Sequence, residues 1–216
     1  MDDDVRCRLC GGVAAPWVPG YLACGACGYV QVEREALPDA DRARERYLLH
    51  RNDPSDRGYV AWLERFIDAA VEPFMPRGSV LLDYGSGPTA VLSGLLRGRG
   101  YDLTSWDPFF EPGADPFGRA WDAIVVHEVA EHLAEPGAEL GALAASLRAG
   151  GCLCIRTRFP PPTPEAFRSW WYRSDFTHVG FFTPATFGAF AARSGMDVIL
   201  LLEPDTVVLR TAAVAR

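Results

Sequence analysis

The architecture of this 216-residue chain is predicted by one segment, Val80-Leu81-Leu82-Asp83-Tyr84-Gly85-Ser86-Gly87-Pro88-Thr89-Ala90. A short apolar run enters a glycine turn, and a helical pattern follows over residues 88–98. In an open α/β sheet such a turn lies at the carboxyl end of a strand beside a helix N-terminus, where these sheets bind ligands. We therefore expect a ligand to contact this loop.

Two carboxylates near the loop indicate the charge of that ligand. Asp83 precedes the first glycine by two positions, where it would repel a pyrophosphate and attract an ammonium or sulfonium group. Asp107 follows 24 residues later, the spacing at which a carboxylate accepts hydrogen bonds from ribose hydroxyls. An adenosine ligand with a cationic tail fits both residues. A nicotinamide dinucleotide, which the pattern Gly85-x-Gly87-x-x-Ala90 also permits, and solvated turn carboxylates remain the alternatives.

Apolar runs and helical patterns alternate on both sides of the loop. This alternation predicts an α/β fold with a parallel sheet and crossover helices, and the turn Glu203-Pro204-Asp205 predicts a terminal antiparallel hairpin. The predicted strands are 80–82, 103–106, 124–126, 152–156, 198–202 and 206–212, and the predicted helices are 88–98, 129–148 and about 184–194.

Residues 36–77 precede the loop and carry two helical patterns, which Asn52-Asp53-Pro54 interrupts. We expect them to form a helical bridge or cap.

Four of the six cysteines lie near the N-terminus as two C-x-x-C pairs, Cys7/Cys10 and Cys24/Cys27, with 13 residues between the pairs. This pattern predicts a small ribbon in which four thiolates bind Zn²⁺ tetrahedrally, and two disulfides are the alternative. Four protein ligands leave no position for a reacting water, so the predicted role is structural. Cys152 and Cys154 fall in a predicted strand and are expected to be core residues.

The formal net charge is −7, and all 21 basic residues are arginine. The acidic total disfavours nucleic-acid phosphates and anionic membranes and favours a small-molecule partner. Chemistry that requires a lysine is excluded. The start Met1-Asp2-Asp3-Asp4 is acidic where a signal peptide would be basic, and no apolar run is long enough to span a membrane, so we expect a cytoplasmic protein.

From about Val80 onward the chain resembles a class I S-adenosylmethionine-dependent methyltransferase. The resemblance is carried by Leu82–Gly87 as the glycine-rich motif, Asp107 as the ribose acid and Trp121–Glu128 as the fourth strand. It implies a Rossmann-like, mostly parallel sheet and S-adenosyl-L-methionine as cofactor, and the cysteine pairs extend it to methyltransferases with an N-terminal zinc ribbon. The expected division is 1–35 zinc ribbon, 36–77 bridge and 78–216 S-adenosylmethionine-binding domain.

The resemblance also implies which residues contact the cofactor. The chain departs from the family pattern at Thr89, where a third glycine is usual, and Trp121 follows Asp107 by only 14 residues, too few for the usual helix and third strand. Asp115 is the nearest candidate for the acid that binds adenine. The predicted cofactor-binding residues are Asp83, Tyr84, Gly85, Ser86, Gly87, Pro88, Asp107 and His127.

A second cluster follows the fourth strand. Glu128, Glu131 and His132 have helical spacing, which would place them on one helix face, and His178 could complete a site for Mg²⁺, Mn²⁺, iron or Zn²⁺. The Glu-x-x-Glu-His pattern resembles catechol O-methyltransferases of ubiquinone synthesis and terminal ribose 2′-O-methyltransferases of small RNAs, which use these positions with a metal. Metal-free acid/base use of Glu128 or His132, or a first helix turn rich in acids, is the alternative. The predicted catalytic residues are Glu128, His132 and His178.

Residues 159–182 are rich in aromatic side chains and are predicted to form a substrate lid, with core packing as the alternative. Tyr47, His50 and Asn52 are expected to border the same pocket.

The predicted function is methyl transfer from S-adenosylmethionine to a small hydroxylated or aromatic acceptor. One alternative is an RNA methyltransferase whose ribbon presents Arg6, Arg8 and Arg34 to phosphates. Another is a non-catalytic binding module whose ribbon contacts a protein partner.

Overall fold

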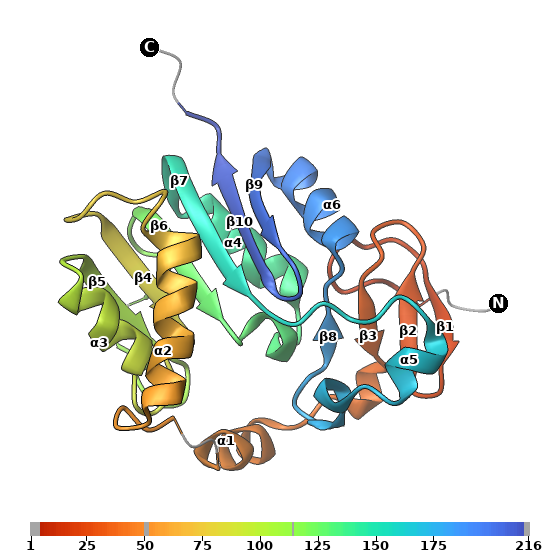
Figure 1. Ribbon diagram of the computed structural model, residues 1–216. Helices are drawn as coiled ribbons and strands as arrows, with labels where there is room; N and C mark the ends of the chain where they lie inside the picture. Colours follow the sequence, from red (N-terminus) through yellow and green to blue (C-terminus); the bar gives the residue numbers. More distant parts are fainter. Residues whose placement is uncertain (1–4, 50–51, 114, 214–216) are drawn as a thin grey trace.

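The computed structural model describes residues 5–49, 52–113 and 115–213 and has a six-stranded sheet at its centre (Figure 1). The strand order is β5-β4-β6-β7-β10-β9. Strands β4 to β7 pair in parallel, whereas β10 is antiparallel to both β7 and β9. The mostly parallel α/β sheet and its antiparallel hairpin are therefore confirmed. The strands are β4 (Val80–Tyr84), β5 (Asp102–Trp106), β6 (Trp121–His127), β7 (Leu147–Arg156), β9 (Met196–Leu202) and β10 (Thr206–Thr211).

Helices cover both faces of this sheet, which explains why the central strands are apolar on both sides. Ala123 and Val125 of β6 belong to a core cluster with residues of α2 (Arg57–Phe66) and α3 (Val91–Gly98). The intervening Ile124 and Val126 belong to a second cluster with α4 (Pro136–Ala145) and α6 (Pro184–Ser194). These four β6 residues are 0% exposed.

Local sequence signals fix the ends of the helices. Asp39 caps α1 (Ala40–Leu48), Asp56 caps α2, and Thr183 forms a capping box with Thr186 at the start of α6. A π-helical turn, η2 (Ile67–Val71), extends α2. The two helical patterns predicted in residues 36–77 are thus α1 and α2.

The cysteine-bearing segment contributes three strands to a second sheet, which has four antiparallel strands. Three of them are β1 (Ala14–Val18), β2 (Tyr21–Cys24) and β3 (Val30–Val32). The fourth, β8 (Gly180–Phe181), comes from the chain between β7 and α6 and pairs with β3. The predicted boundary between a zinc ribbon and a helical bridge at residue 35 stays a prediction. The second sheet includes strands from both sides of this boundary.

The helix predicted over residues 129–148 is wrong in its extent. The chain forms a 3-10 turn, η3 (Ala130–His132), then α4, and β7 begins at Leu147. Between β5 and β6 the described residues form no strand, so β5 lies at the edge of the sheet as the short spacing suggested. Shorter elements are η1 (Arg34–Ala36), α5 (Pro164–Arg168) and η4 (Trp171–Ser174).

Within the described residues, no helix is of the length and apolar character that crossing a membrane requires.

Candidate active site and cysteine cluster

One cavity of about 470 Å³ opens at the carboxyl ends of β4, β5 and β6, the usual ligand position in such a sheet. Both groups of predicted residues, those for the cofactor and those for the acceptor, line this single cavity. The predicted residues among its lining are Asp83, Tyr84, Gly85, Ser86, Gly87, Pro88, Asp107, His127, Glu128, Glu131, His132 and His178.

The glycine loop turns sharply where β4 ends. Gly85 has φ +79°, and a Cβ at this position would run into the side chain of Val129. The amides of Gly85 and Ser86 donate to the main-chain oxygen of Trp106 at 2.8 and 3.1 Å. A residue with a side chain would have both a strained backbone and no space here, so the loop requires glycine.

The two predicted carboxylates at the loop are held by hydrogen bonds. Asp83 is 2% exposed and accepts from the hydroxyl of Ser93 at 2.6 Å. Burial raises the pKa of Asp83 to about 6. Asp107 accepts from the amides of Gly87, Phe109 and Phe110, so it shapes the two loops that border the cavity.

Aromatic rings form one wall of the cavity. Tyr84 stacks on Trp106 with 4.7 Å between ring centroids, and its hydroxyl donates to Glu139 at 3.1 Å. Asp115, the candidate for adenine, is not among the lining residues, and its carboxylate accepts from the amide of Phe117.

His127 lies between aromatic rings of α2. Its ring centroid is 4.6 Å from that of Trp62 and 4.8 Å from that of Phe66. Burial, assisted by the charge of Arg156, lowers the pKa of His127 to about 3. The imidazole is therefore neutral at physiological pH, and its buried Nε2 has no hydrogen-bond partner.

Glu128 occupies a left-handed backbone conformation, with φ +54°, directly after β6. Such strain in a non-glycine residue is typical of functional sites. Its carboxylate lies 3.1 Å from the hydroxyl of Tyr172 and 3.5 Å from Nε of Arg156. Burial and the neighbouring Glu131 raise the pKa of Glu128 to about 8, against the opposing effect of Arg156.

Glu131, His132 and His178 bring one ligand atom each to within 4.8 Å of one another. Nδ1 of His132 lies 2.9 Å from the main-chain oxygen of Thr177, and Nδ1 of His178 lies 2.6 Å from that of Tyr172. If each Nδ1 donates to its carbonyl, each Nε2 keeps its lone pair for a ligand. Burial lowers the pKa of His132 to about 4, which keeps this imidazole neutral.

Glu131 is fully buried, at 0% exposure. The Tyr172 hydroxyl donates to one carboxylate oxygen, whereas the other oxygen has no hydrogen-bond partner. A buried carboxylate oxygen without a partner is costly, and a cation would satisfy it. One oxygen and two imidazole nitrogens suit a divalent transition metal, so the residues present fit such an ion.

The predicted helical face of Glu128, Glu131 and His132 does not form. The left-handed turn at Glu128 separates it from the η3 turn, and the structure does not bring it into the three-residue cluster. The amide of Val179 donates to the main-chain oxygen of Glu131 at 2.8 Å, and this bond brings the His178 segment against η3.

Charge in the cavity is mainly negative. Arg46 is the one arginine among the described residues that line the cavity, and it forms an ion pair with Asp175 at 2.6 Å. The acidic lining residues are Asp83, Asp107, Glu128, Glu131, Glu139 and Asp175. Such a cavity attracts cationic ligands and repels phosphates.

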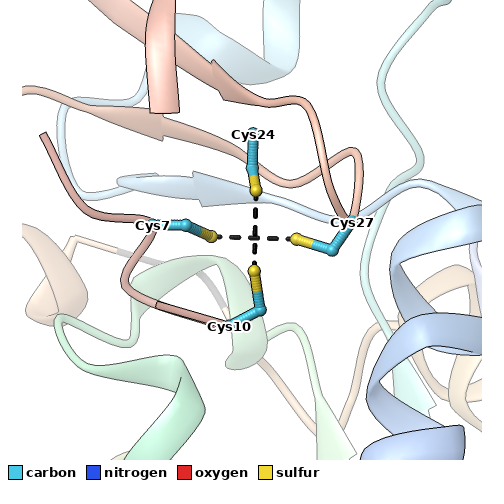
Figure 2. A group of neighbouring side chains, drawn as sticks. All are labelled: Cys7, Cys10, Cys24 and Cys27. Atoms are coloured by element: carbon cyan, nitrogen blue, oxygen red, sulfur yellow. Dashed lines mark hydrogen bonds between the residues drawn. The ribbon is translucent and has the colours of Figure 1, made fainter. Parts of the chain in front are cut away.

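The four N-terminal cysteines converge on one point (Figure 2). The Sγ atoms of Cys7 and Cys27 are 3.7 Å apart and those of Cys10 and Cys24 are 3.5 Å apart. A disulfide requires about 2.05 Å, and all four cysteines are free. Tetrahedral Zn²⁺ with bonds of about 2.3 Å would separate its sulfurs by about 3.8 Å. The geometry thus fits a Zn²⁺ ion and not the disulfide alternative.

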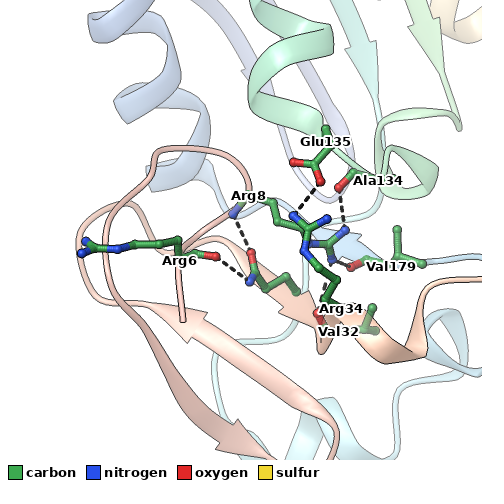
Figure 3. A network of polar contacts seen from close by, with 8 residues as sticks. Arg6, Arg8, Val32, Arg34, Ala134, Glu135 and Val179 are labelled. Atoms are coloured by element: carbon green, nitrogen blue, oxygen red, sulfur yellow. Dashed lines mark hydrogen bonds and ion pairs between the residues drawn. The ribbon is translucent and has the colours of Figure 1, made fainter. Parts of the chain in front are cut away.

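Of the three ribbon arginines, Arg8 and Arg34 form contacts within the chain, whereas Arg6 is exposed and its side chain points away from them (Figure 3). Arg8 is 9% exposed and donates to main-chain oxygens of Ala134 and Val179, so it is not presented to phosphates as the RNA alternative requires. Arg34 forms an ion pair with Glu135 at 2.7 Å.

The aromatic segment 159–182 has two roles. Trp171 is 66% exposed and lines the cavity, whereas Phe167, Phe181 and Phe182 are fully buried. Core packing, the alternative, therefore accounts for part of the segment. Tyr47 and Asn52 line the cavity as expected, and His50 lies outside the described residues.

Several residues of the cavity were not predicted. Tyr59 and Trp62 belong to an apolar stripe of α2 that the sequence presents as ordinary core. The hydroxyl of Tyr172, which reaches two carboxylates, has no signal in the sequence beyond the aromatic character of its segment.

A family model described as a methyltransferase domain matches residues 58–201. Three solved structures share the fold. The Burkholderia thailandensis 1,6-didemethyltoxoflavin-N1-methyltransferase, solved with 1,6-didemethyltoxoflavin and S-adenosylhomocysteine, is 14% identical with a TM-score of 0.55, over 92% of this chain and 99% of that one.

The mitomycin 7-O-methyltransferase MmcR is 15% identical with a TM-score of 0.55, over 81% of this chain and 59% of that one. The [4+2]-cyclase SpnF is 12% identical with a TM-score of 0.51, over 76% and 85%. A search of curated proteins finds no match.

Proposed function

This chain belongs to the class I S-adenosylmethionine-dependent methyltransferases, and we propose that it methylates a small acceptor that carries a hydroxyl group or an aromatic ring. The mitomycin and toxoflavin enzymes, whose names specify small-molecule acceptors, support the acceptor class. Because a cyclase shares the fold, the proposal depends on the chemistry of the cavity.

On the cofactor side, Asp83, the loop 84–88, Asp107 and His127 would hold S-adenosylmethionine. It supplies the methyl group, and its sulfonium becomes a neutral thioether as the methyl leaves. Asp83 and Asp107 give this end of the cavity negative charge, which favours the cationic donor, and the Tyr84–Trp106 stack offers a planar contact to an adenosine.

On the acceptor side, Glu131, His132 and His178 would bind a divalent transition-metal ion such as Mn²⁺. The cation would lower the pKa of an acceptor hydroxyl and orient its oxygen. Glu128, beside this cluster, is our candidate for taking the hydroxyl proton, so that the O–H bond breaks as the O–CH₃ bond forms. Trp171 and Trp62 would pack against a planar acceptor.

One observation carries this proposal: the carboxylate of buried Glu131, one oxygen of which has no hydrogen bond, lies beside two imidazoles in the same cavity as the glycine loop. We also propose a structural Zn²⁺ on Cys7, Cys10, Cys24 and Cys27. The reducing cytoplasm, where thiolates persist, is the proposed location.

The test is methyl transfer from isotopically labelled S-adenosylmethionine to small catechols and phenols, with and without added Mg²⁺ or Mn²⁺. Catechol dimethyl ether, which has no hydroxyl, is the matched negative control. We expect S-adenosylhomocysteine to bind, NAD⁺ not to bind, and transfer to require a hydroxyl and the added metal. If S-adenosylhomocysteine fails to bind, the cofactor assignment is wrong. If extensively dialysed protein transfers methyl groups at the same rate with and without added metal, the assignment of the second metal site is wrong.

RNA remains the second candidate substrate class, and the acidic cavity and the burial of Arg8 weigh against it. Binding of a short RNA that falls steeply with salt would support it instead.

A further inference from the structure

Arg8 projects out of the ribbon into the rest of the chain. It lies between Cys7 and Cys10 in the first cysteine turn, yet its side chain is buried where the ribbon meets the η3 turn and β8 (Figure 3). A charged side chain is buried only when it has partners, and the partners of Arg8 are main-chain oxygens.

The guanidinium of Arg8 joins the two segments that carry the imidazoles of the acceptor site. Nη1 donates to the oxygen of Ala134 at 2.8 Å, and Nη2 donates to that of Val179 at 2.8 Å. Ala134 follows His132 by two residues, and Val179 directly follows His178. The guanidinium is planar and rigid, so it fixes the separation of the two oxygens that it binds.

Arg8 is itself fixed by the ribbon. Its amide donates to Oε1 of Gln31 at 2.8 Å, and its main-chain oxygen accepts from the amide of Gly137 at 3.1 Å. A Cβ at Gly137 would run into the main-chain oxygen of Leu9, so the first cysteine turn lies directly against the start of α4. Metal-bound Cys7 and Cys10 would hold this turn in one conformation.

The β3–β8 pairing supports the same connection. Val32 donates its amide to the main-chain oxygen of Val179 at 3.1 Å, the oxygen that Arg8 also binds. Contacts that originate in the ribbon therefore add to the direct bond between the Val179 amide and the Glu131 oxygen in fixing the position of His178.

We propose that Arg8 is a positioning residue, which holds the His132 and His178 segments at the separation that lets their imidazoles act together. The cysteine cluster then serves the acceptor site through Arg8, although no cysteine lines the cavity. This inference rests on the acceptor site proposed above.

The test compares Arg8→Met with Arg34→Met. Arg34 also spans from the ribbon to the rest of the chain, through Glu135, but its side chain is 65% exposed, so its loss should have little effect. Arg8→Lys is the second variant in case Arg8→Met does not fold, because lysine keeps the charge but lacks the planar fork.

The chain has only four histidines, so the imidazole NMR spectrum of histidine-labelled protein reports on His127, His132 and His178 separately, without any added metal. In the Arg8 variants we expect the His132 and His178 signals to shift or broaden while the His127 signal stays in place. Zinc content should remain one per chain. Mn²⁺ affinity should fall at least tenfold, and S-adenosylhomocysteine affinity should change less than twofold.

Unchanged His132 and His178 signals in the Arg8 variants would overturn the proposal. So would equal shifts of all three imidazoles, which would mean general loosening of the structure. If wild-type protein binds no Mn²⁺, the proposed metal site fails, whereas the imidazole spectra still decide whether Arg8 positions the two histidines.

Discussion

Tyr172 donates its hydroxyl hydrogen to the carboxylate of Glu131. The main-chain oxygen of the same tyrosine lies 2.6 Å from Nδ1 of His178, so one residue of η4 contacts two members of the three-residue cluster. Groups that hold metal ligands in place commonly change metal affinity by about 10- to 100-fold when they are removed.

The Tyr172→Phe variant tests this arrangement. The ring keeps its packing, but Glu131 loses its hydrogen bond, so we expect Mn²⁺ affinity to fall about tenfold or more and methyl transfer to fall with it. Mn²⁺ titration by calorimetry and initial rates provide the measurement. Tyr101→Phe is the matched control, since its hydroxyl donates to Met75 in the core and should affect stability alone. Equal Mn²⁺ affinity in the two variants would contradict the prediction.

The Asp83→Asn variant should make the ligand-free protein more stable above pH 6. The native pKa of about 6 exceeds the unfolded value of about 3.9, so native protein binds the proton more tightly, and its free energy of unfolding falls as the pH rises through this interval. Asparagine does not titrate, so the variant avoids this fall, and its free energy of unfolding at neutral pH should be higher by at most about 3 kcal/mol. Urea unfolding between pH 4 and 8 measures it.

The same substitution should weaken S-adenosylmethionine binding, because the amide lacks the negative charge that attracts the cation. Asp122→Asn is the control of opposite sign. Its pKa is lowered by hydrogen bonds from the Val80 amide and from Arg148, so its charge stabilises the fold above the unfolded pKa. That variant should lose stability at neutral pH and keep its ligand affinity. A destabilised Asp83→Asn protein at pH 8 would refute our interpretation.

The Gly85→Ala and Gly87→Ala variants separate backbone strain from steric overlap. Both glycines have positive φ, +79° and +69°, which costs a residue with a side chain about 1 to 2 kcal/mol. Only at Gly85 would the new methyl group also meet Val129. We expect Gly85→Ala to be the more destabilised in the absence of ligand, measured by thermal unfolding, and Gly85→Ala/Val129→Ala to recover the difference. Equal losses in the two single variants would show that the overlap is relieved without cost.

The Cys24→Ser variant should lose the bound zinc and several kcal/mol of folding free energy, because zinc binding is part of the stability of such ribbons. Cys24 is 3% exposed and belongs to the larger core cluster. Elemental analysis and thermal unfolding are the measurements. Cys154→Ser, which changes a buried thiol far from the cluster in sequence, should keep one zinc per chain. Wild-type protein that contains no zinc would contradict the assignment.

Local sequence patterns predict much of this fold. The apolar runs that become β4, β5, β6 and β7, the glycines that turn after β4 and the spacing of the four cysteines are all signals within a few residues. The short distance between Asp107 and Trp121 also predicted that a strand would be missing. Such features are predictable because the period of a strand, the geometry of a turn and the ligand preference of zinc are local constraints.

The remaining features depend on contacts between distant segments. Glu128-Val129-Ala130-Glu131-His132 contains mostly good helix formers, yet the chain turns left-handed at Glu128, whose amide donates to Arg156 of the next strand. Arg8 in a ribbon looks like a surface charge, and its bonds reach residues 126 and 171 positions away. No local pattern encodes either arrangement.

The two-residue strand β8 delays completion of the ribbon sheet during synthesis, because β8 is translated long after the strand with which it pairs. The ribbon begins near residue 5, but the partner of β3 is Gly180–Phe181, about 150 residues later in translation. A nascent chain emerging from the ribosome must therefore hold its cysteine turns with one edge of β3 unpaired until most of the polypeptide has been made. Transplanted onto another protein, the first 35 residues would leave that edge open, so the ribbon is a poor candidate for a portable module.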